Sequence, residues 1–245
     1  MLTPITCTTT NRICALLLGE SGTGKTSQIR CLLGQENRDG RWVSSNLQPE
    51  KVFVLSAEAG LLCVRDLVVA GKVQGFEIHN LSEFKEAFGY CNSVEFKQKG
   101  FSWIVIDSLT EIASRCVSEM QAKYPNKSDS FKLWQDYTNI LTDIVKAFRD
   151  ISSVSVAVTC LLAYEKDEFQ RRYPVPDIPG SGLKSRLVSY FDESLVLGRI
   201  KDAEGKEHLC FQTTEPAGLA KDRSGKLAPV EEPNILKIKN KIISK

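Results

Sequence analysis

The feature that most constrains this chain is a glycine-rich loop set between a strand-like run and a helix-like run. The loop has the pattern G-x-x-x-x-G-K-[ST] and consists of Gly19, Glu20, Ser21, Gly22, Thr23, Gly24, Lys25 and Thr26. Residues 13–18 before it are all apolar, as in a buried parallel strand, and residues 27–33 after it can continue as a helix. Strand, loop and helix in this order favour a phosphate-binding loop over a chance glycine-rich turn.

The residue types in this loop explain how it would hold a nucleotide. Its glycines allow positive φ and bring backbone N–H groups close to phosphate oxygens, while the following helix directs its positive end toward them. Lys25 would reach the β- and γ-phosphates, and the Thr26 hydroxyl would bind Mg²⁺. The expected cofactors are therefore ATP and Mg²⁺.

Composition limits the class of protein. The 245 residues suffice for one large α/β domain or two small ones. The formal net charge of +2 gives no global basic field, so any contact with nucleic acid must come from local patches. No run of about 18 apolar residues predicts a membrane span, and residues 1–12 are too polar for a signal peptide. We expect a cytoplasmic protein with no membrane partner.

The cysteines do not form a disulfide or metal-binding pattern. The eight are Cys7, Cys14, Cys31, Cys63, Cys91, Cys116, Cys160 and Cys210. No C-x-x-C pair occurs among them, and neither His79 nor His208 lies near a cysteine pair, which disfavours a zinc site. Several lie in apolar runs, where free cysteine behaves as a small hydrophobe, and we expect them to be reduced.

Apolar runs alternate with helix-like stretches along the chain. Strands are expected over residues 51–55, 76–78, 102–107 and 154–162, and helices over residues 60–70, 82–88 and 131–149, with Ser82 as an N-cap. This alternation predicts an α/β fold with a mostly parallel central sheet and helices on both faces. Residues 193–200 and 207–212, joined by a hairpin turn over residues 201–206, predict antiparallel strands toward the C-terminus.

No internal repeat or linker divides this pattern. We therefore expect a single domain over residues 1–245, with an N-terminal arm over residues 1–12 and a basic C-terminal tail over residues 234–245. Two polar segments, residues 117–130 and 164–184, are long for connections inside a compact domain. Such loops are usually functional or disordered.

Two acids follow expected strands and so point to the same edge of the sheet. Asp107 follows four apolar residues, the Walker B pattern, which favours a Mg²⁺ ligand over a simple turn residue. Glu58 follows the second strand and is the best candidate to orient or deprotonate water, with a helix-start acid as the alternative. Ser108 follows Asp107, which disfavours the AAA+ arrangement with its adjacent D-E pair.

These features together resemble the RecA superfamily of ATPases, in which a glutamate follows the strand after the P-loop helix, as Glu58 does here. Over nearly the whole chain the similarity is to small phage RecA-like ATPases, the Sak-type single-strand annealing proteins. The motifs that carry it are the phosphate-binding loop, Glu58, residues 103–108 and residues 216–225. The resemblance implies a RecA-like P-loop NTPase fold and an ATP hydrolase stimulated by DNA, acting in the host cytoplasm if a phage encodes it.

Residues 221–225, with the sequence K-D-R-S-G, resemble the K-x-R-x-G segment of RadA-like and DnaB-like members. The resemblance implies that Lys221 and Arg223 reach the γ-phosphate held by a neighbouring subunit. A cation supplied in this way neutralises transition-state charge, so the isolated monomer would hydrolyse ATP poorly. A basic surface turn is the alternative interpretation.

In sequence order, the two long polar segments correspond to the DNA-binding loops of RecA-like recombinases. The second segment mixes cations with aromatic rings that would stack on unpaired bases, namely Lys166, Phe169, Arg171, Arg172 and Tyr173. The first segment offers Lys123, Tyr124 and Lys127. A solvated charged face is the alternative for both segments and for the lysines of the tail.

Family members also place a polar sensor between the nucleotide and the DNA loops, usually an asparagine or glutamine. Thr159 and Tyr164 are the nearest residues of this kind in the strand over residues 154–162 and just after it. The chain therefore departs from the family pattern at the point where nucleotide and DNA would be coupled.

The resemblance implies single-stranded DNA and a homo-oligomer, either ring or filament, as partners, with a single-strand binding protein as a further candidate. Three other functions remain open. A helicase-type motor or loader would use the same K-x-R-x-G segment. A nucleotide kinase would use the same phosphate-binding loop, with Arg171 and Arg172 imitating a lid. A nucleotide-binding switch without enzymatic activity is the third.

Overall fold

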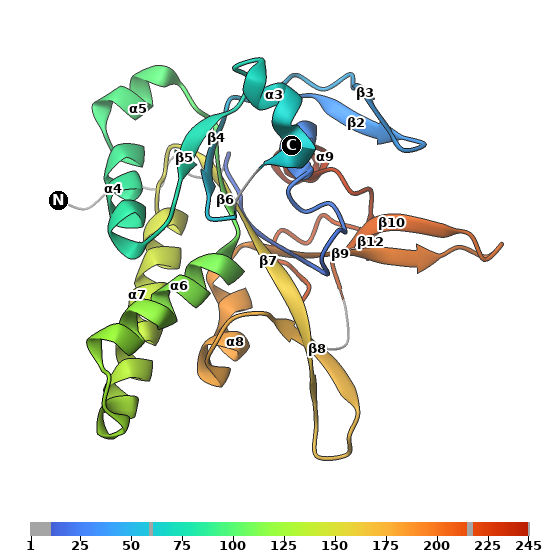
Figure 1. Ribbon diagram of the computed structural model, residues 1–245. Coiled ribbons are helices and arrows are strands. Elements are labelled where there is room, and N and C mark those ends of the chain that lie inside the picture. The colour runs from blue at the N-terminus through green and yellow to red at the C-terminus, as the bar shows by residue number, and fades with distance from the viewer. Residues whose placement is uncertain (1–10, 59–60, 215–217, 245) are drawn as a thin grey trace.

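The computed structural model describes residues 11–58, 61–214 and 218–244. A large sheet with the strand order β12-β10-β9-β1-β7-β6-β4-β5 forms its centre (Figure 1). The strands of this path are β1 (Cys14–Gly19), β4 (Val52–Ser56), β5 (Gln74–Glu77), β6 (Trp103–Asp107), β7 (Ser155–Lys166), β9 (Glu193–Lys201), β10 (Glu207–Gln212) and β12 (Val230–Glu231). Two more strands join the sheet at its sides, β8 (Arg172–Pro176) on β7 and β11 (Lys221–Asp222) on β9.

The pairing directions confirm the predicted fold class. All pairs between neighbours from β9 through β1, β7, β6 and β4 to β5 are parallel, whereas β9–β10 and β10–β12 are antiparallel. The β9–β10 hairpin lies where the sequence predicts it. The molecule therefore has an α/β P-loop NTPase fold, with its carboxyl-terminal strand ends gathered at one edge of the sheet.

Side chains of β1 alternate between two hydrophobic cores, which explains its unbroken apolar run. Leu16 and Leu18 face the core under α4 (Leu81–Cys91), α6 (Leu109–Lys123), α7 (Ser130–Arg149) and α8 (Ser181–Leu187). Ala15 and Leu17 face the core under α2 (Gln28–Leu32), α3 (Arg65–Val69) and α9 (Ile235–Ile243). Figure 1 shows these two groups of helices on opposite sides of the sheet. A strand covered on both faces has no polar face.

The remaining elements are short. They are the separate hairpin of β2 (Gln35–Arg38) and β3 (Arg41–Ser44), the helix α5 (Val94–Lys99), and the 3₁₀ turns η1 (Leu62–Val64), η2 (Lys127–Asp129) and η3 (Val188–Tyr190). Within the described ranges, no helix combines the length and apolarity that crossing a membrane requires.

The prediction of a long loop over residues 117–130 is wrong. Helix α6 continues to Lys123, and only a short connection with the turn η2 separates it from α7. Ile112, Cys116 and Met120 are buried at four-residue spacing, while most residues between Val117 and Lys123 face solvent. The segment is polar because it is the exposed face of an amphipathic helix.

The prediction of a long loop over residues 164–184 is also wrong. Strand β7 continues to Lys166, turns, and pairs with β8 in the antiparallel register Lys166 to Arg172 and Leu162 to Pro176. Helix α8 then begins at Ser181. The β7–β8 hairpin projects from the body of the molecule in Figure 1. Its two prolines are tolerated because β8 is an edge strand.

Two smaller predictions need correction. The N-cap of α4 is Asn80 instead of Ser82, because its side chain accepts the Glu83 N–H at 2.9 Å. In place of a helix over residues 60–70, the described chain forms η1 and α3, while residues 59–60 lie outside the described ranges. Most of the N-terminal arm, residues 1–10, also lies outside them.

The expected basic tail is an ordered helix with one buried face. Ile235, Leu236 and Ile238 of α9 pack into the second core, and the buried Lys239 donates to Glu50 Oε1 at 2.5 Å. Gln28 of α2 bonds the chain at both Pro233 O and Ile235 N–H. The tail therefore supports the helix that follows the phosphate-binding loop, and residue 245 lies outside the described chain.

Candidate functional site

The glycine-rich loop connects β1 to α2 at the carboxyl edge of the sheet. Gly22 and Gly24 have φ of +76° and +95°, values that favour glycine. A side chain at Gly19 would meet Thr23 Oγ1 at 2.7 Å and Leu197 O at 2.8 Å, so the loop packs tightly against β9. One hydrogen-bonded turn over residues 25–27 leads into α2, which places the loop at the start of a helix, as expected.

Lys25 is a buried cation that is held by the loop itself. Its Nζ donates to Gly19 O at 2.8 Å and to Glu20 O at 2.9 Å. Burial lowers the pKa of Lys25, and the nearby Asp107 and Glu58 carboxylates counter part of that shift. The ammonium group is thus desolvated and poorly compensated, a state that an incoming phosphate would relieve.

Asp107 ends β6 and meets the loop. Its side chain is 3% exposed, and the Thr26 hydroxyl donates to its Oδ2 at 2.9 Å. The buried Thr159 of β7 donates to Oδ1 at 2.5 Å. Burial and the Glu58 charge raise the pKa of Asp107, while the two hydroxyl donors and Lys25 oppose the rise.

Oxygen ligands suit Mg²⁺, and this pair supplies them. The Thr26 hydroxyl and the Asp107 carboxylate already lie within hydrogen-bonding distance of each other, beside a loop that fits phosphate. A cation between them would favour the ionised form of Asp107. The residues present therefore fit the metal that the phosphate-binding loop implies.

Glu58 follows β4 and lies next to Asp107 at the same edge. Ser108 Oγ donates to Glu58 Oε1 at 2.6 Å, and the Ser56 hydroxyl donates to the Glu58 carbonyl at 2.9 Å. Arg115 of α6 donates to Ala57 O at 2.6 Å. The carboxylate is exposed but its backbone is tied down, which suits a group that must meet water.

A family model described as an AAA domain matches residues 11–224 of the chain. The chain belongs to this family. Membership identifies an ATPase of the P-loop class, with nucleotide binding and usually Mg²⁺ as family properties. No curated protein matches the chain.

The residue after Asp107 bears on this family assignment. Ser108 stands where an adjacent D-E pair would place its acid, yet the chain belongs to the AAA-domain family. The missing acid therefore does not exclude this family. In the structure of this AAA domain, Ser108 instead donates to Glu58, which approaches from the neighbouring strand β4.

The cations and rings of the second polar segment lie on the β7–β8 hairpin of this AAA domain. Lys166 ends β7, Arg172 and Tyr173 begin β8, and Phe169 and Arg171 occupy the turn between them. The Phe169 ring is 69% exposed, with the Arg171 guanidinium 5.1 Å from its centroid. The structure thus brings all five candidate DNA-binding residues together on one projection.

This hairpin is linked to the phosphate-binding loop through Tyr164. The Tyr164 hydroxyl donates to Glu20 Oε1 at 2.8 Å, and the Arg172 guanidinium lies 4.9 Å from the centroid of the Tyr164 ring. Of the two sensor candidates, Thr159 contacts Asp107 and Tyr164 contacts the loop. Both contacts cross between distant parts of the chain.

Lys221 and Arg223 lie far along the sheet from the phosphate-binding loop of their own chain. Strand β11 pairs with the start of β9, at Ser194 and Glu193, whereas the loop follows the carboxyl end of β1. Lys221 Nζ donates to Phe191 O at 2.6 Å. Arg223 pairs with Asp192 at 3.1 Å, with a side chain that is 69% exposed. The structure does not bring these two cations to Lys25 within one chain.

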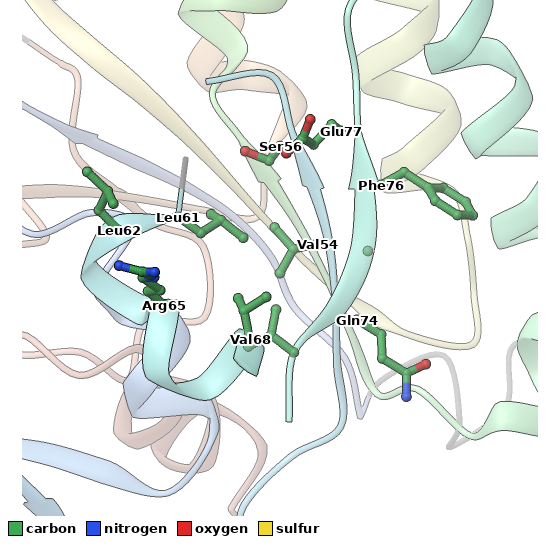
Figure 2. A pocket seen from close by; sticks show the side chains of 11 residues that line it. Val54, Ser56, Leu61, Leu62, Arg65, Val68, Gln74, Phe76 and Glu77 are labelled. Atoms are coloured by element: carbon green, nitrogen blue, oxygen red, sulfur yellow. The ribbon is translucent and has the colours of Figure 1, made fainter. Parts of the chain in front are cut away.

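A cavity of about 530 Å³ lies beside the site, between α3 and the edge strand β5 (Figure 2). Val54, Leu61 and Val68 form an apolar wall, and Ser56 and Glu77 lie close together at one end. None of its lining residues belongs to the phosphate-binding loop, so the cavity is separate from the phosphate chemistry.

Sequence reasoning missed Ser108 and Arg115 as parts of this site. Ser108 was visible only as the residue after Asp107, and Arg115 as one position of a helix. Their roles depend on contacts across 50 and 58 residues of chain, with Glu58 and Ala57. The seven described cysteines are free.

Proposed function

We propose that this AAA-domain protein is a RecA-like, Mg²⁺-dependent ATPase that acts on single-stranded DNA in phage recombination or annealing. The observation that carries the proposal is the meeting of Lys25, Thr26 and Asp107 with Glu58 at one edge of the sheet. Three separate strands supply these groups, so their meeting is a product of the fold and is absent from any short segment of sequence.

Each residue has a distinct role in the proposed reaction. Loop N–H groups and Lys25 hold the triphosphate, and Thr26 with Asp107 would hold Mg²⁺, which neutralises charge on the β- and γ-phosphates when bound. Thr159 keeps one Asp107 oxygen engaged. Glu58, held by Ser108, orients the attacking water and accepts its proton.

The position of Lys221 and Arg223 supports ATP binding at a subunit interface. Both cations lie too far along the sheet to serve their own loop, and Arg223 is largely exposed. A neighbouring copy in a ring or filament would present them to the γ-phosphate. This arrangement makes hydrolysis depend on assembly.

The β7–β8 hairpin supports the DNA part of the proposal. Cations on it would neutralise phosphates, and the exposed Phe169 and Tyr173 rings would stack on unpaired bases. The Tyr164 contact with Glu20 connects this surface to the loop that holds the nucleotide. Nucleotide state would therefore bias the hairpin and change DNA affinity.

The test is steady-state ATP hydrolysis by the full chain, with and without a single-stranded oligonucleotide, at several salt concentrations. We expect Mg²⁺-dependent hydrolysis that the oligonucleotide stimulates and that high salt suppresses. Activity unchanged by the oligonucleotide at every salt concentration would remove the DNA role and leave the ATPase intact.

Two further readouts separate the alternatives. Transfer of phosphate to a nucleoside monophosphate would identify a kinase. A hexameric ring that separates strands would identify a motor, whereas filaments or strand annealing support the proposed function.

A further inference from the structure

The turn that carries Arg223 is anchored by a buried acid of the neighbouring strand. Glu193 begins β9 and is 1% exposed. Its Oε2 accepts the Arg223 N–H at 3.2 Å, and its Oε1 accepts the Ser224 N–H at 3.2 Å. Both carboxylate oxygens are therefore used to hold the backbone of the turn.

A second acid holds the same turn from its other side. Asp222 Oδ1 accepts the Ser224 hydroxyl at 2.5 Å and the Gly225 N–H at 2.9 Å, and Oδ2 accepts the Leu227 N–H at 2.9 Å. Asp222 lies opposite Glu193 in the β11–β9 pairing, and the two side chains are hydrogen-bonded to each other. The turn is thus fixed from residue 222 to residue 227.

The pKa values of the two carboxyl groups are shifted in opposite directions. Burial and the neighbouring Asp222 charge raise the pKa of Glu193 to about 8. Burial alone would raise the pKa of Asp222 too, but donors from Ser224, Leu227 and Gly225 lower it. Glu193 is therefore the protonated member of the pair at neutral pH.

A buried carboxyl next to a half-buried one is an unfavourable way to stabilise an ordinary surface turn. Burial of polar groups costs free energy even when they are hydrogen-bonded, and apolar residues would serve packing as well. The pair of acids fixes the backbone that carries Arg223, whose side chain is 69% exposed and paired only at the surface with Asp192. A cation whose backbone is already fixed needs little reorganisation to stabilise the negative charge that develops on a phosphate in the transition state.

We propose that Glu193, paired with Asp222, is a positioning residue for Arg223, which it holds ready for the triphosphate of a neighbouring subunit. The inference rests on the proposed function, in which Arg223 acts in trans. Glu193 itself lies beside Ala15 of β1, below the phosphate-binding loop, and touches no part of it in its own chain.

The decisive experiment is a double-mutant cycle on the ATPase activity of the assembled full chain. Glu193→Gln keeps the size of the side chain but turns an N–H₂ toward one of the two backbone N–H donors. We expect kcat to fall about tenfold because Arg223 is no longer aligned, with unchanged affinity for a fluorescent ATP analogue. In an Arg223→Ala background, the same substitution should have no further effect on kcat. Glu207→Gln, at an exposed position on β10, is the matched control.

Each outcome of this cycle decides a separate point. If Arg223→Ala lowers kcat but Glu193→Gln does not, or if the two effects add fully, the positioning role is wrong and the proposed function stands. If Arg223→Ala itself leaves kcat unchanged, the function of Arg223 in trans is wrong. Loss of ATP-analogue affinity in Glu193→Gln would show general damage to the domain and overturn the assignment.

The pH profile of the wild-type protein gives an independent readout, which remains available if the Gln variant does not fold. As pH rises through about 8, Glu193 loses its proton and faces the Asp222 carboxylate. The other charged or titratable groups around the pair are Asp192, Cys14, Lys221 and Arg223. We expect kcat to fall in this range and the Arg223 and Ser224 amides to exchange faster than base catalysis alone explains. A flat kcat with unchanged amide protection would contradict the proposal.

Discussion

The phosphate-binding centre and the β7–β8 hairpin both carry cations, but their surroundings are opposite. Lys25 and Asp107 are 8% and 3% exposed. Lys25 is held by carbonyls of its own loop, and Asp107 accepts from Thr26 and Thr159, which lie 81 and 52 residues away in sequence. In the hairpin, Arg171 pairs with Asp167 and Lys166 with Gln170, each within four residues and exposed. Contacts between distant segments fix Asp107 in the first region, whereas the tip of the hairpin is held mainly by local contacts. A fixed centre suits transition-state stabilisation, and an adaptable one suits a flexible polyanion.

The largest effect is expected for a substitution of Lys25 in the phosphate-binding centre. Lys25→Met removes a buried ammonium group whose loop geometry is already set, so no neighbouring cation can replace it. We expect the affinity for a Mg²⁺–ATP analogue to fall about 100-fold, as for the loss of a charged hydrogen bond of about 3 kcal/mol. Calorimetric titration measures this affinity.

The exposed Lys72 provides the control, because Lys72→Met removes the same charge without touching the loop. Equal affinities for the Lys25 and Lys72 variants would mean that the loop does not bind phosphate through Lys25.

Substitution of Glu58 is expected to have the next largest effect. It should lower the rate of hydrolysis without changing the affinity for nucleotide. Glu58→Gln keeps the contact with Ser108 but removes the proton acceptor. We expect kcat for ATP hydrolysis to fall on the order of 100-fold, a typical value for removal of a general base, with analogue affinity within about twofold of wild type. Single-turnover and steady-state rates provide the measurement.

Glu77→Gln is the matched control, since Glu77 ends the adjacent strand β5 at the same edge of the sheet. A Glu58→Gln variant with wild-type kcat would make Glu58 a structural acid at a helix start and would remove it from the mechanism.

The same contrast explains which parts of the molecule could be predicted from sequence. The phosphate-binding loop is a continuous motif, and β1, β4 and β6 are apolar because both sheet faces are covered. Their positions and the fold class follow from local patterns. Glu58 and Asp107 are found in the same way, because parallel strands end at one edge.

The two wrong loop predictions fall on ordered elements whose exposed residues are polar. Most buried residues of helix α6 lie before residue 117, and within residues 117–130 only Met120 is buried, so solvent-facing residues dominate that segment. Strand β8 contains one arginine and two prolines, and local propensity disfavours proline in a strand. Contacts such as Ser108 with Glu58 and Tyr164 with Glu20 join residues 50 and 144 positions apart, and no sequence period encodes them.

The hairpin should respond more weakly to substitution than the centre does. The double substitution Arg171→Ala and Arg172→Ala removes two exposed cations, and we expect affinity for single-stranded DNA to fall about tenfold at moderate salt. The slope of log affinity against log salt should become shallower by about 0.7 for each DNA phosphate that the variant no longer neutralises. Fluorescence anisotropy across a salt series measures both quantities.

The β9–β10 hairpin offers a matched control, because Lys201→Ala and Lys206→Ala also remove two exposed cations from a β-hairpin. If both double variants lose the same affinity, net charge alone explains binding and the β7–β8 hairpin is not a specific DNA surface.

The smallest effect is expected at the contact that joins the two regions. Tyr164→Phe removes the hydrogen bond to Glu20 but keeps the ring beneath Arg172. An exposed hydrogen bond contributes about 1 kcal/mol at most, so we expect basal ATP hydrolysis to change little and stimulation by single-stranded DNA to fall about threefold. The ratio of stimulated to basal kcat is the quantity to measure.

Tyr173→Phe sharpens this last test, because Tyr173 donates to Glu165 within the hairpin and makes no contact with the phosphate-binding loop. If Tyr164 links the two regions, only the Tyr164 variant loses stimulation while both retain DNA affinity. Equal stimulation in the two variants would instead mean that the Tyr164–Glu20 contact does not couple the hairpin to the phosphate-binding loop.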